Sequence, residues 1–289
     1  MLAYRHAFHA GNHADVLKHA VLTMVLRYMN TKDKPYRLVD THAGAGGYSL
    51  EGRHAQKKGE FEQGIARLWK RDDLPPALAD YVHLVRRFNP GGDLEPGSAA
   101  VLLEQYPGSP AFAQMLLRPH DQLRLYELHP TDHRILKSYI GEARGAEVYD
   151  TDGFEALKAQ LPPSTRRAVV LMDPSYEGHG DYSRVVAALR DGIHRFADGV
   201  YMVWYPQVTK LEAAQLPRRL EALSPKAWLH ARLTVQQPDS QGFGLSGSGV
   251  FIINPPYTLH AQLLGLLPYL VDVLGQYDGA NYLLEQRVA

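Results

Sequence analysis

The chain has 289 residues, of which 45% are hydrophobic, so it is long enough to bury a full core. It contains no cysteine, which excludes disulfide bonds, thiolate metal ligands and any cysteine nucleophile. With 31 basic and 31 acidic side chains the formal net charge is zero, so a nucleic-acid partner needs a local patch. The histidine-rich start does not resemble a signal peptide and no segment is apolar enough to span a membrane, so we expect a soluble, cytoplasmic protein.

The first predicted element is a long amphipathic helix over residues 12–30, where apolar residues recur at helical spacing and Asn12 is a suitable N-cap. A short strand over residues 36–40 follows and runs into the glycine-rich loop THAGAGGY. Residues 60–89 then carry two helical segments, bounded by glycine-rich and proline-rich stretches. We expect these segments to form a small helical insert at about residues 50–95.

Four further strands alternate with helices in the rest of the chain. The strands cover residues 123–130, 146–154, 168–176 and 199–206, and the helices lie near 131–140, 154–161 and 181–195. This alternation predicts an α/β fold with a Rossmann-like, doubly wound and mostly parallel sheet, covered by helices on both faces. Residues 226–236 and 247–257 break the rhythm, and we expect them to pair as antiparallel strands at a C-terminal edge. We predict a single domain over residues 1–289.

Polar residues at the ends of these strands are candidates for a site, because ligands of open α/β sheets bind beyond the carboxyl ends of the strands. The loop from Asp40 to Gly47 lets backbone approach a ligand closely, since glycine has no Cβ. A dinucleotide fingerprint would need glycine where Ser49 stands and an acid about 20 positions later, which disfavours a hydride-transferring enzyme. The spacing of Asp40, Gly44 and Gly46 suits S-adenosylmethionine, whose amino and carboxylate groups need separate polar partners.

Two later strand ends extend this interpretation. Glu127 would accept hydrogen bonds from both ribose hydroxyls of the cofactor, and Asp152, followed by Gly153, would accept one from the adenine amine. The alternative is that these glycines and acids only shape turns and cap helices.

The tetrapeptide Asp173-Pro174-Ser175-Tyr176 follows the fourth strand of the alternating run. An exocyclic amine on a planar ring is a poor nucleophile because its lone pair is delocalised, so two acceptors must localise that pair. The Asp173 carboxylate and the Pro174 carbonyl are suited to this task. Tyr176 offers a ring on which an extruded base stacks, worth about 1–3 kcal/mol. We predict a clamp for a flipped base, although these four residues alone also fit a plain turn.

Two other patterns compete with this one. The tetrapeptide NPPY that begins at Asn254 fits an amino-methyltransferase motif better by its letters, but it follows the irregular end of the predicted sheet. His9 and His13 have the spacing of helical metal ligands, but neither an H-E-x-x-H pattern nor a matching carboxylate accompanies them. We therefore place the chemistry at Asp173 and predict no metal site.

Six motifs in chain order carry a resemblance to a known family: YRHAFHAGNHADVLKHA, DTHAGAGGY, YPGSP, ELHP, DGF and DPSY. Together they resemble the bacterial 23S ribosomal RNA adenine-N6 methyltransferase J family over nearly the whole chain. The resemblance implies an S-adenosylmethionine-dependent enzyme with a Rossmann-like fold and a helical insert. With the glycine loop, the expected cofactor contacts are Lys18, His19, His42, Gly44, Ser109, Glu127, Asp152, Gly153 and Asp173.

The resemblance also implies that Asp173 is the catalytic acceptor, assisted by Pro174 and Tyr176, and that Tyr4 lies near the RNA. The family pattern is D-P-P-Y, whereas Ser175 stands at the second proline here. Because serine fixes φ less firmly than proline, we expect a less rigid turn and a slower enzyme with the same chemistry.

We therefore expect methyl transfer from S-adenosylmethionine to N6 of a flipped adenine in 23S ribosomal RNA. The expected enzyme is a monomer that acts on protein-free RNA or an early assembly intermediate. The lack of cysteine excludes pyrimidine C5 methylation through a thiolate adduct. Two alternatives remain open: the same chemistry on adenine or cytosine of DNA, and a catalytically silent nucleic-acid-binding protein linked to the use of external DNA.

Overall fold

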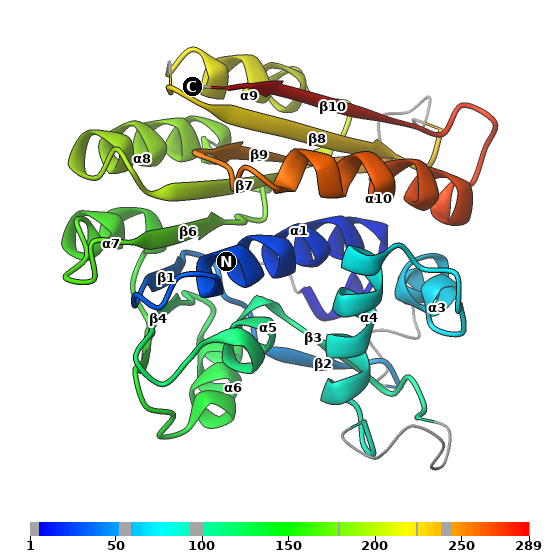
Figure 1. Cartoon of the computed structure of the whole chain (residues 1–289), viewed down its shortest axis with the longest axis horizontal. Coiled ribbons are helices and arrows are strands. Elements are labelled where there is room, and N and C mark those ends of the chain that lie inside the picture. Colours follow the sequence, from blue (N-terminus) through cyan, green and yellow to red (C-terminus); the bar gives the residue numbers. More distant parts are fainter. Residues whose placement is uncertain are drawn as a thin grey trace.

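The computed structural model describes residues 6–51, 59–92, 101–178, 180–223, 225–237 and 244–288. At its centre is an eight-stranded sheet in the order β10-β8-β9-β7-β6-β1-β4-β5, with helices on both faces (Figure 1). Five neighbouring strands are parallel: β1 (Arg37–Asp40), β4 (Gln122–Tyr126), β5 (Ala146–Tyr149), β6 (Ala168–Met172) and β7 (Val200–Gln207). The predicted doubly wound, mostly parallel sheet is confirmed.

The C-terminal part of the sheet is antiparallel. β9 (Gly247–Ile253) lies between β7 and β8 (Trp228–Thr234) and is antiparallel to both, so the two late strands pair as predicted. The outer edge, however, is β10 (Asn281–Arg287), which the sequence pattern did not predict. Most of β10 is exposed, and no buried face imposes the alternation by which strands are recognised. A separate two-stranded ladder joins β2 (Gly47–Ser49) to β3 (Gln105–Pro107).

Alternate side chains of the central strands fill two hydrophobic cores, one on each face of the sheet. Leu38 and Leu171 belong to the first core, whereas Val39 and Val170 belong to the second. The first core is covered by α1 (His13–Asn30), α5 (Ser109–Leu116), α6 (Pro130–Ile140) and α10 (Leu259–Leu274), and the second by α7 (Gly153–Gln160), α8 (Asp181–Arg195) and α9 (Leu211–Glu221).

Three helical segments occupy the described part of residues 50–95: η2 (Glu60–Gln63), α3 (Ile65–Leu68) and α4 (Pro76–Phe88). The first two segments pack against residues 11 and 12, which lie between the short turn η1 (His6–Phe8) and α1. A Cβ on Gly64 would lie 2.1 Å from the carbonyl oxygen of Gly11, so only glycine allows this approach. Asn12 Nδ2 donates a hydrogen bond to Glu60 at 3.0 Å.

The helix α1 begins as predicted, because the Asn12 side chain accepts hydrogen bonds from the N–H groups of Ala14 and Asp15. The predicted amphipathic character is wrong. The sheet, α4, α5 and α10 surround the helix, so it is buried on nearly all sides (Figure 1). Its polar residues Asp15, Lys18 and His19 are therefore buried as well.

β1 is the strand at which the order of the parallel strands reverses. β1 lies between β4 and β6, so the chain leaves β1 towards one side and returns to the other side at β6. A crevice forms beyond the carboxyl ends of the strands at such a point. Asp40 ends β1 and Asp173 directly follows β6, so the fold brings both carboxylates to this crevice.

The cap of α1 can be tested by substitution. Asn12→Ala removes the side-chain acceptor of two helical N–H groups, and we expect the free energy of unfolding to fall by about 0.5–2 kcal/mol. Urea denaturation measures this difference. Asn12→Ser keeps a capping oxygen and should retain most of the stability. Equal losses in both variants would assign the effect to the lost bond with Glu60.

Candidate active site

Two adjoining cavities lie beyond the carboxyl ends of β1 and β6. The first encloses about 170 Å³ and is bordered by the ends of β1, β4 and β6 and by the starts of α5 and α7. Two of the nine predicted cofactor residues, Gly44 and Asp152, are not part of this lining, but Gly44 contacts the lining residue Glu127 and Asp152 contacts the lining residue Arg184. Seven of the nine predicted residues line the cavity: Lys18, His19, His42, Ser109, Glu127, Gly153 and Asp173.

Gly44 fixes the carboxylate of Glu127. The Gly44 N–H donates to Glu127 Oε2 at 2.8 Å, and the His129 N–H donates to Oε1 at 2.6 Å. Gly44 has a φ of +65°, and a Cβ there would lie 2.3 Å from the hydroxyl oxygen of Tyr48. The glycine loop therefore presents an oriented carboxylate at the end of β4, which is the polar partner predicted for ribose hydroxyls.

Asp152 supports the wall of the cavity because it caps the start of α7. Its Oδ1 accepts hydrogen bonds from Phe154 N–H and Glu155 N–H, and its Oδ2 contacts Arg184, so both oxygens already have partners. The next residue, Gly153, packs against Thr41, and a Cβ there would lie 2.1 Å from the Thr41 carbonyl oxygen. The backbone of β1 and that of α7 thus form a close-fitting wall.

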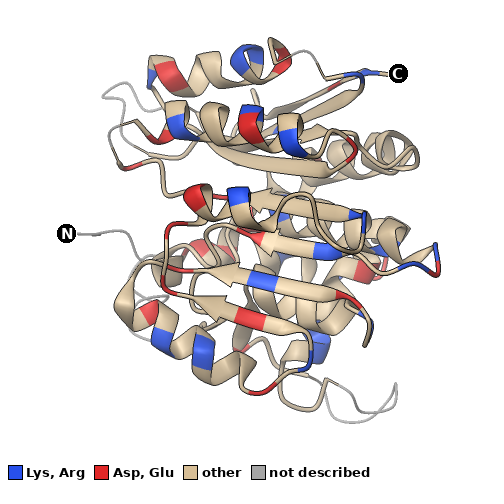
Figure 2. Ribbon diagram, turned by 90° about the vertical axis from the view of Figure 1, so that its left-hand side faces the viewer, with Lys and Arg blue, Asp and Glu red and all other residues tan. Residues whose placement is uncertain are grey.

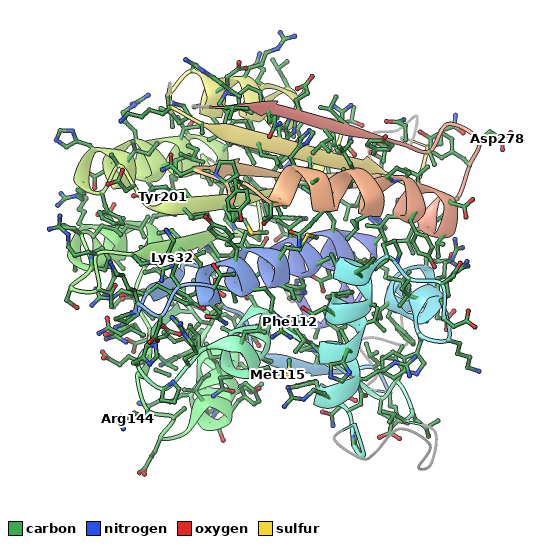
Figure 3. All side chains as sticks on the ribbon, in the orientation of Figure 1. Lys32, Phe112, Met115, Arg144, Tyr201 and Asp278 are labelled. Carbon is green, nitrogen blue, oxygen red and sulfur yellow. The ribbon has the colours of Figure 1, made fainter. Side chains whose placement is uncertain are left out.

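His19 and His42, two of the four histidines that line the first cavity, have lowered pKa values and are neutral near pH 7. Burial lowers the pKa of His42 to about 4, and burial, followed by the charge of Lys18, holds the pKa of His19 well below its usual value. His19 Nδ1 shares a hydrogen bond with the Tyr106 hydroxyl at 2.8 Å. Among the described residues, His19 Nε2 has no hydrogen-bond partner. Phe112, labelled in Figure 3, packs its ring 4.9 Å from that of His19.

Lys18 belongs to a buried ion cluster between the two cavities. Its ammonium group lies 3.0 Å from Asp15 Oδ1 and 2.5 Å from Asp173 Oδ2, and only 4% of the residue is exposed. Burial by itself lowers the pKa of Lys18, but the two carboxylates outweigh burial and raise it above its usual value. Lys18 therefore stays charged and holds Asp173 in place.

The second cavity encloses about 290 Å³ and shares His6, Lys18, Asp173 and Ser175 with the first, so Asp173 lies where the two cavities meet. Pro174 lines only the first of the two. The rest of the second cavity has a polar side and an aromatic side. The polar side includes His9, Asn12 and Glu60, and the aromatic side is formed by Tyr176, Tyr182 and Trp204.

Tyr176 is held firmly beside Asp173. Its hydroxyl donates to the Trp204 carbonyl oxygen at 2.6 Å, and its ring lies 4.5 Å from that of Tyr182. Only 3% of Tyr176 is exposed, so its ring is reached through the second cavity and not from the open surface. Its φ of 55° is unusual for a residue other than glycine and is typical of strained functional sites.

The competing tetrapeptide lies at the opposite edge of the sheet. Because β9 runs antiparallel to β7, Asn254 follows β9 beside the start of β7, away from the carboxyl ends of the parallel strands. Its side-chain amide donates to the carbonyl oxygens of Ala197 and Gly199, each at 2.7 Å. Tyr257 is 83% exposed. The predicted position of this motif, after an antiparallel strand, is confirmed.

Sequence reasoning missed several residues of the site. Asp15 stands three residues before Lys18 on one helical face, which was a usable signal for an ion pair. Trp204 belongs to a buried strand and Tyr182 to an ordinary helix, and their sequence patterns predict only core packing. Tyr4 was predicted near the RNA, but it lies outside the described residues.

Other features of the described residues are less distinctive. On the side shown in Figure 2, acidic and basic residues are interspersed. Within the described ranges, no three histidine or acidic side chains gather as metal ligands. In the same ranges, every helix is too short or too polar to cross a bilayer.

The close fit at Gly153 can be tested. Gly153→Ala places a methyl group against the Thr41 carbonyl, so we expect α7 to shift and both thermal stability and S-adenosylmethionine affinity to fall. Gly265→Ala in α10 is the matched control, since a Cβ at that position would have no atom within 4 Å and alanine favours the helix. Thermal unfolding and calorimetry measure the two effects. Unchanged affinity in Gly153→Ala would contradict a role for this wall in binding.

Comparisons with known proteins identify the family of the chain. A family model described as ribosomal RNA large subunit methyltransferase D, RlmJ, matches residues 33–285. The chain is 46% identical over 270 residues to ribosomal RNA large subunit methyltransferase J of Escherichia coli, covering 93% of each chain. It is 43% identical over 274 residues to the protein of that name from Haemophilus influenzae, covering 95% of this chain and 94% of the relative.

A crystal structure of a Legionella pneumophila protein is also similar. It has a TM-score of 0.86 and 34% sequence identity, and the match covers 96% of this chain and 98% of that one. The matched family model, the two relatives and this structure each cover most of the chain. The chain belongs to the ribosomal RNA large subunit methyltransferase J family.

Proposed function

We propose that the protein transfers a methyl group from S-adenosylmethionine to the exocyclic N6 amine of an adenine in 23S ribosomal RNA. The observation that carries this proposal is the position of Asp173, which lines both cavities at their junction. A donor in the first cavity and a base in the second would meet at this carboxylate. Holding two reactants in such a geometry supplies much of the acceleration in a transfer reaction.

The lining of the first cavity suits the cofactor. Glu127 would accept hydrogen bonds from the ribose hydroxyls, and Asp152 and Gly153 would meet the adenine through the start of α7. Lys18 and His19, with its unpartnered Nε2 among the described residues, suit the carboxylate end of the methionine part, and Ser109 suits its amino end. His42 would add a neutral ring that packs 4.7 Å from Phe154. When bound, the cofactor supplies an electrophilic methyl group.

The acceptor side relies on the tetrapeptide that begins at Asp173. Lys18 contacts Asp173 through Oδ2, and we propose that the N6 amine reaches from the second cavity into the junction, where Oδ1 and the Pro174 carbonyl accept its two hydrogens. This arrangement localises the lone pair of the amine. A strong base is not required, because the nitrogen becomes acidic only after it has been methylated and can then release its surplus proton to water. Tyr176, fixed by its bond to the Trp204 carbonyl, would pack on the base.

The polymer substrate is proposed from the names of the relatives, which describe ribosomal RNA as the target. A net charge of zero suits a small contact area, since each phosphate contact needs a nearby cation. We propose that Tyr4 approaches the RNA and that a monomer acts in the cytoplasm on protein-free RNA or an early assembly intermediate.

We also propose that residues 1–289 act as a single methyltransferase domain with the insert at about residues 50–95. The support is the position of Glu60, which lines the second cavity and contacts both His9 and Asn12. On this arrangement the insert forms part of the base-binding wall.

The role of Asp173 predicts a specific defect. In Asp173→Ala, we expect kcat on protein-free 23S ribosomal RNA to fall by about 100-fold or more, because the amine loses its acceptor, while cofactor binding persists. Methyl transfer from labelled S-adenosylmethionine and calorimetry measure the two properties. Asp191→Ala, which removes an exposed carboxylate on α8, is the control and should leave activity unchanged.

The same assay separates the alternatives. Duplex DNA is offered beside the RNA, and the labelled nucleoside is identified after digestion. Label in N6-methyladenosine from RNA supports the proposal, whereas label found only in DNA would overturn it. Full activity of Asp173→Ala would place the chemistry elsewhere.

A further inference from the structure

Asp40 is a buried carboxylate next to the first cavity but is not part of its lining. Only 1% of Asp40 is exposed. Its Oδ2 accepts a hydrogen bond from Ser109 Oγ at 2.6 Å, and its Oδ1 accepts one from the His42 N–H at 3.2 Å. Ser109 is 7% exposed and does line the cavity. The Ser109 hydroxyl is therefore the group through which Asp40 can influence a bound ligand.

The protonation state of Asp40 decides what Ser109 offers to the cavity. An ionised carboxylate only accepts hydrogen bonds, so the single hydroxyl proton of Ser109 must point at Asp40. The serine oxygen then presents lone pairs, which suit an ammonium group. A protonated Asp40 can donate its own proton, and the serine hydroxyl is then free to donate into the cavity, where it would repel an ammonium group.

Charged groups from several elements surround Asp40. Lys18 on α1 attracts its carboxylate, and Asp173 at the end of β6 repels it. Glu127 at the end of β4 is held by the N–H groups of Gly44 and His129. Burial, with repulsion by Asp173, outweighs Lys18 and the two hydrogen bonds and raises the pKa of Asp40 to about 7. Both protonation states are therefore populated near neutral pH.

We propose that Asp40 is a positioning residue, whose ionised form fixes Ser109 as an acceptor for the ammonium group of the cofactor, so that cofactor binding and proton release from Asp40 are linked. The inference rests on the proposed use of the first cavity by S-adenosylmethionine. A positive charge bound beside Asp40 favours its ionised form. By reciprocity, ionisation of Asp40 strengthens binding by the same factor.

The sign of the effect follows directly. Below a pH of about 7, ligand binding must expel the proton from Asp40, so affinity rises with pH by up to about tenfold per pH unit. Above that pH, Asp40 is already ionised, and affinity becomes independent of pH.

Isothermal titration calorimetry with S-adenosylhomocysteine tests the linkage in the intact protein. This ligand keeps the amino group and cannot be turned over. Titrations from pH 5.5 to 7.5, in two buffers with different ionisation enthalpies, give the affinity and the number of protons released. We expect release of up to one proton near pH 6, with release falling towards zero above pH 7.5.

Asp40→Asn keeps the size of the side chain but cannot ionise. We expect this variant to release no proton and to bind with an affinity that is independent of pH. Glu147→Gln, which changes an exposed carboxylate on β5, is the matched control and should retain the wild-type pH profile. A wild-type pH profile in Asp40→Asn would overturn the proposal, even if that variant bound more weakly at every pH.

A second measurement needs no ligand. The pKa of Asp40 is higher in the folded chain than in the unfolded chain, so protonated Asp40 adds to the free energy of unfolding. This contribution is fully present below about pH 4 and is lost as the pH rises through about 7. The difference in unfolding free energy between wild type and Asp40→Asn should therefore change across this range. A difference that stays constant from pH 4 to 8 would contradict titration of Asp40 in this range.

The outcomes also separate this inference from the proposed function. Proton-linked binding by a protein that methylates no RNA would support the role of Asp40 and overturn the proposed substrate. Methylation of RNA without any linkage would overturn only the role of Asp40. Failure to bind S-adenosylhomocysteine at every pH would overturn both.

Discussion

The buried contact between Lys18 and the two carboxylates of Asp15 and Asp173 is the interaction on which the site depends. Burying such charges carries a desolvation cost of several kcal/mol per ion, and their attraction rarely does more than offset it. Stability is therefore a poor explanation for the cluster. Its value lies in geometry, because Lys18 is fixed on a helix that is enclosed by the core. A carboxylate bound to it cannot move far from the point where the cavities meet.

The fold supplies the rest of the arrangement through strand direction. Parallel strands place their carboxyl ends along one edge of the sheet. The reversal of strand order at β1 opens a crevice at that edge. Asp40, Glu127 and Asp173 reach this crevice from three adjacent strands, although they are far apart in the sequence. The NPPY tetrapeptide shows the other side of the same rule. Its residues match the amino-methyltransferase motif better. Because β9 is antiparallel, however, Asn254 lies at the edge of the sheet opposite the carboxyl ends of the parallel strands.

Much of this organisation could be predicted from sequence, because it depends on local patterns. The alternation of strands and helices predicted the sheet, Asn12 predicted the start of α1, and the strand ends predicted Glu127, Gly153 and Asp173, which line the first cavity. What could not be predicted depends on packing between distant segments. The pattern of α1 suggested an exposed face, but α4, α5 and α10 cover that face. Likewise, Trp204 becomes a cavity residue only because the start of the chain and the insert face its strand.

The shared wall of the two cavities has a kinetic implication. His6, Lys18, Asp173 and Ser175 border both spaces, so neither compartment can rearrange its boundary without altering the other. If the donor and the base occupy the two cavities as proposed, the ligand that binds first fixes the wall that the second one meets. The spent donor and the modified base would then leave through spaces that share this wall, so the order of their release would affect the rate of turnover.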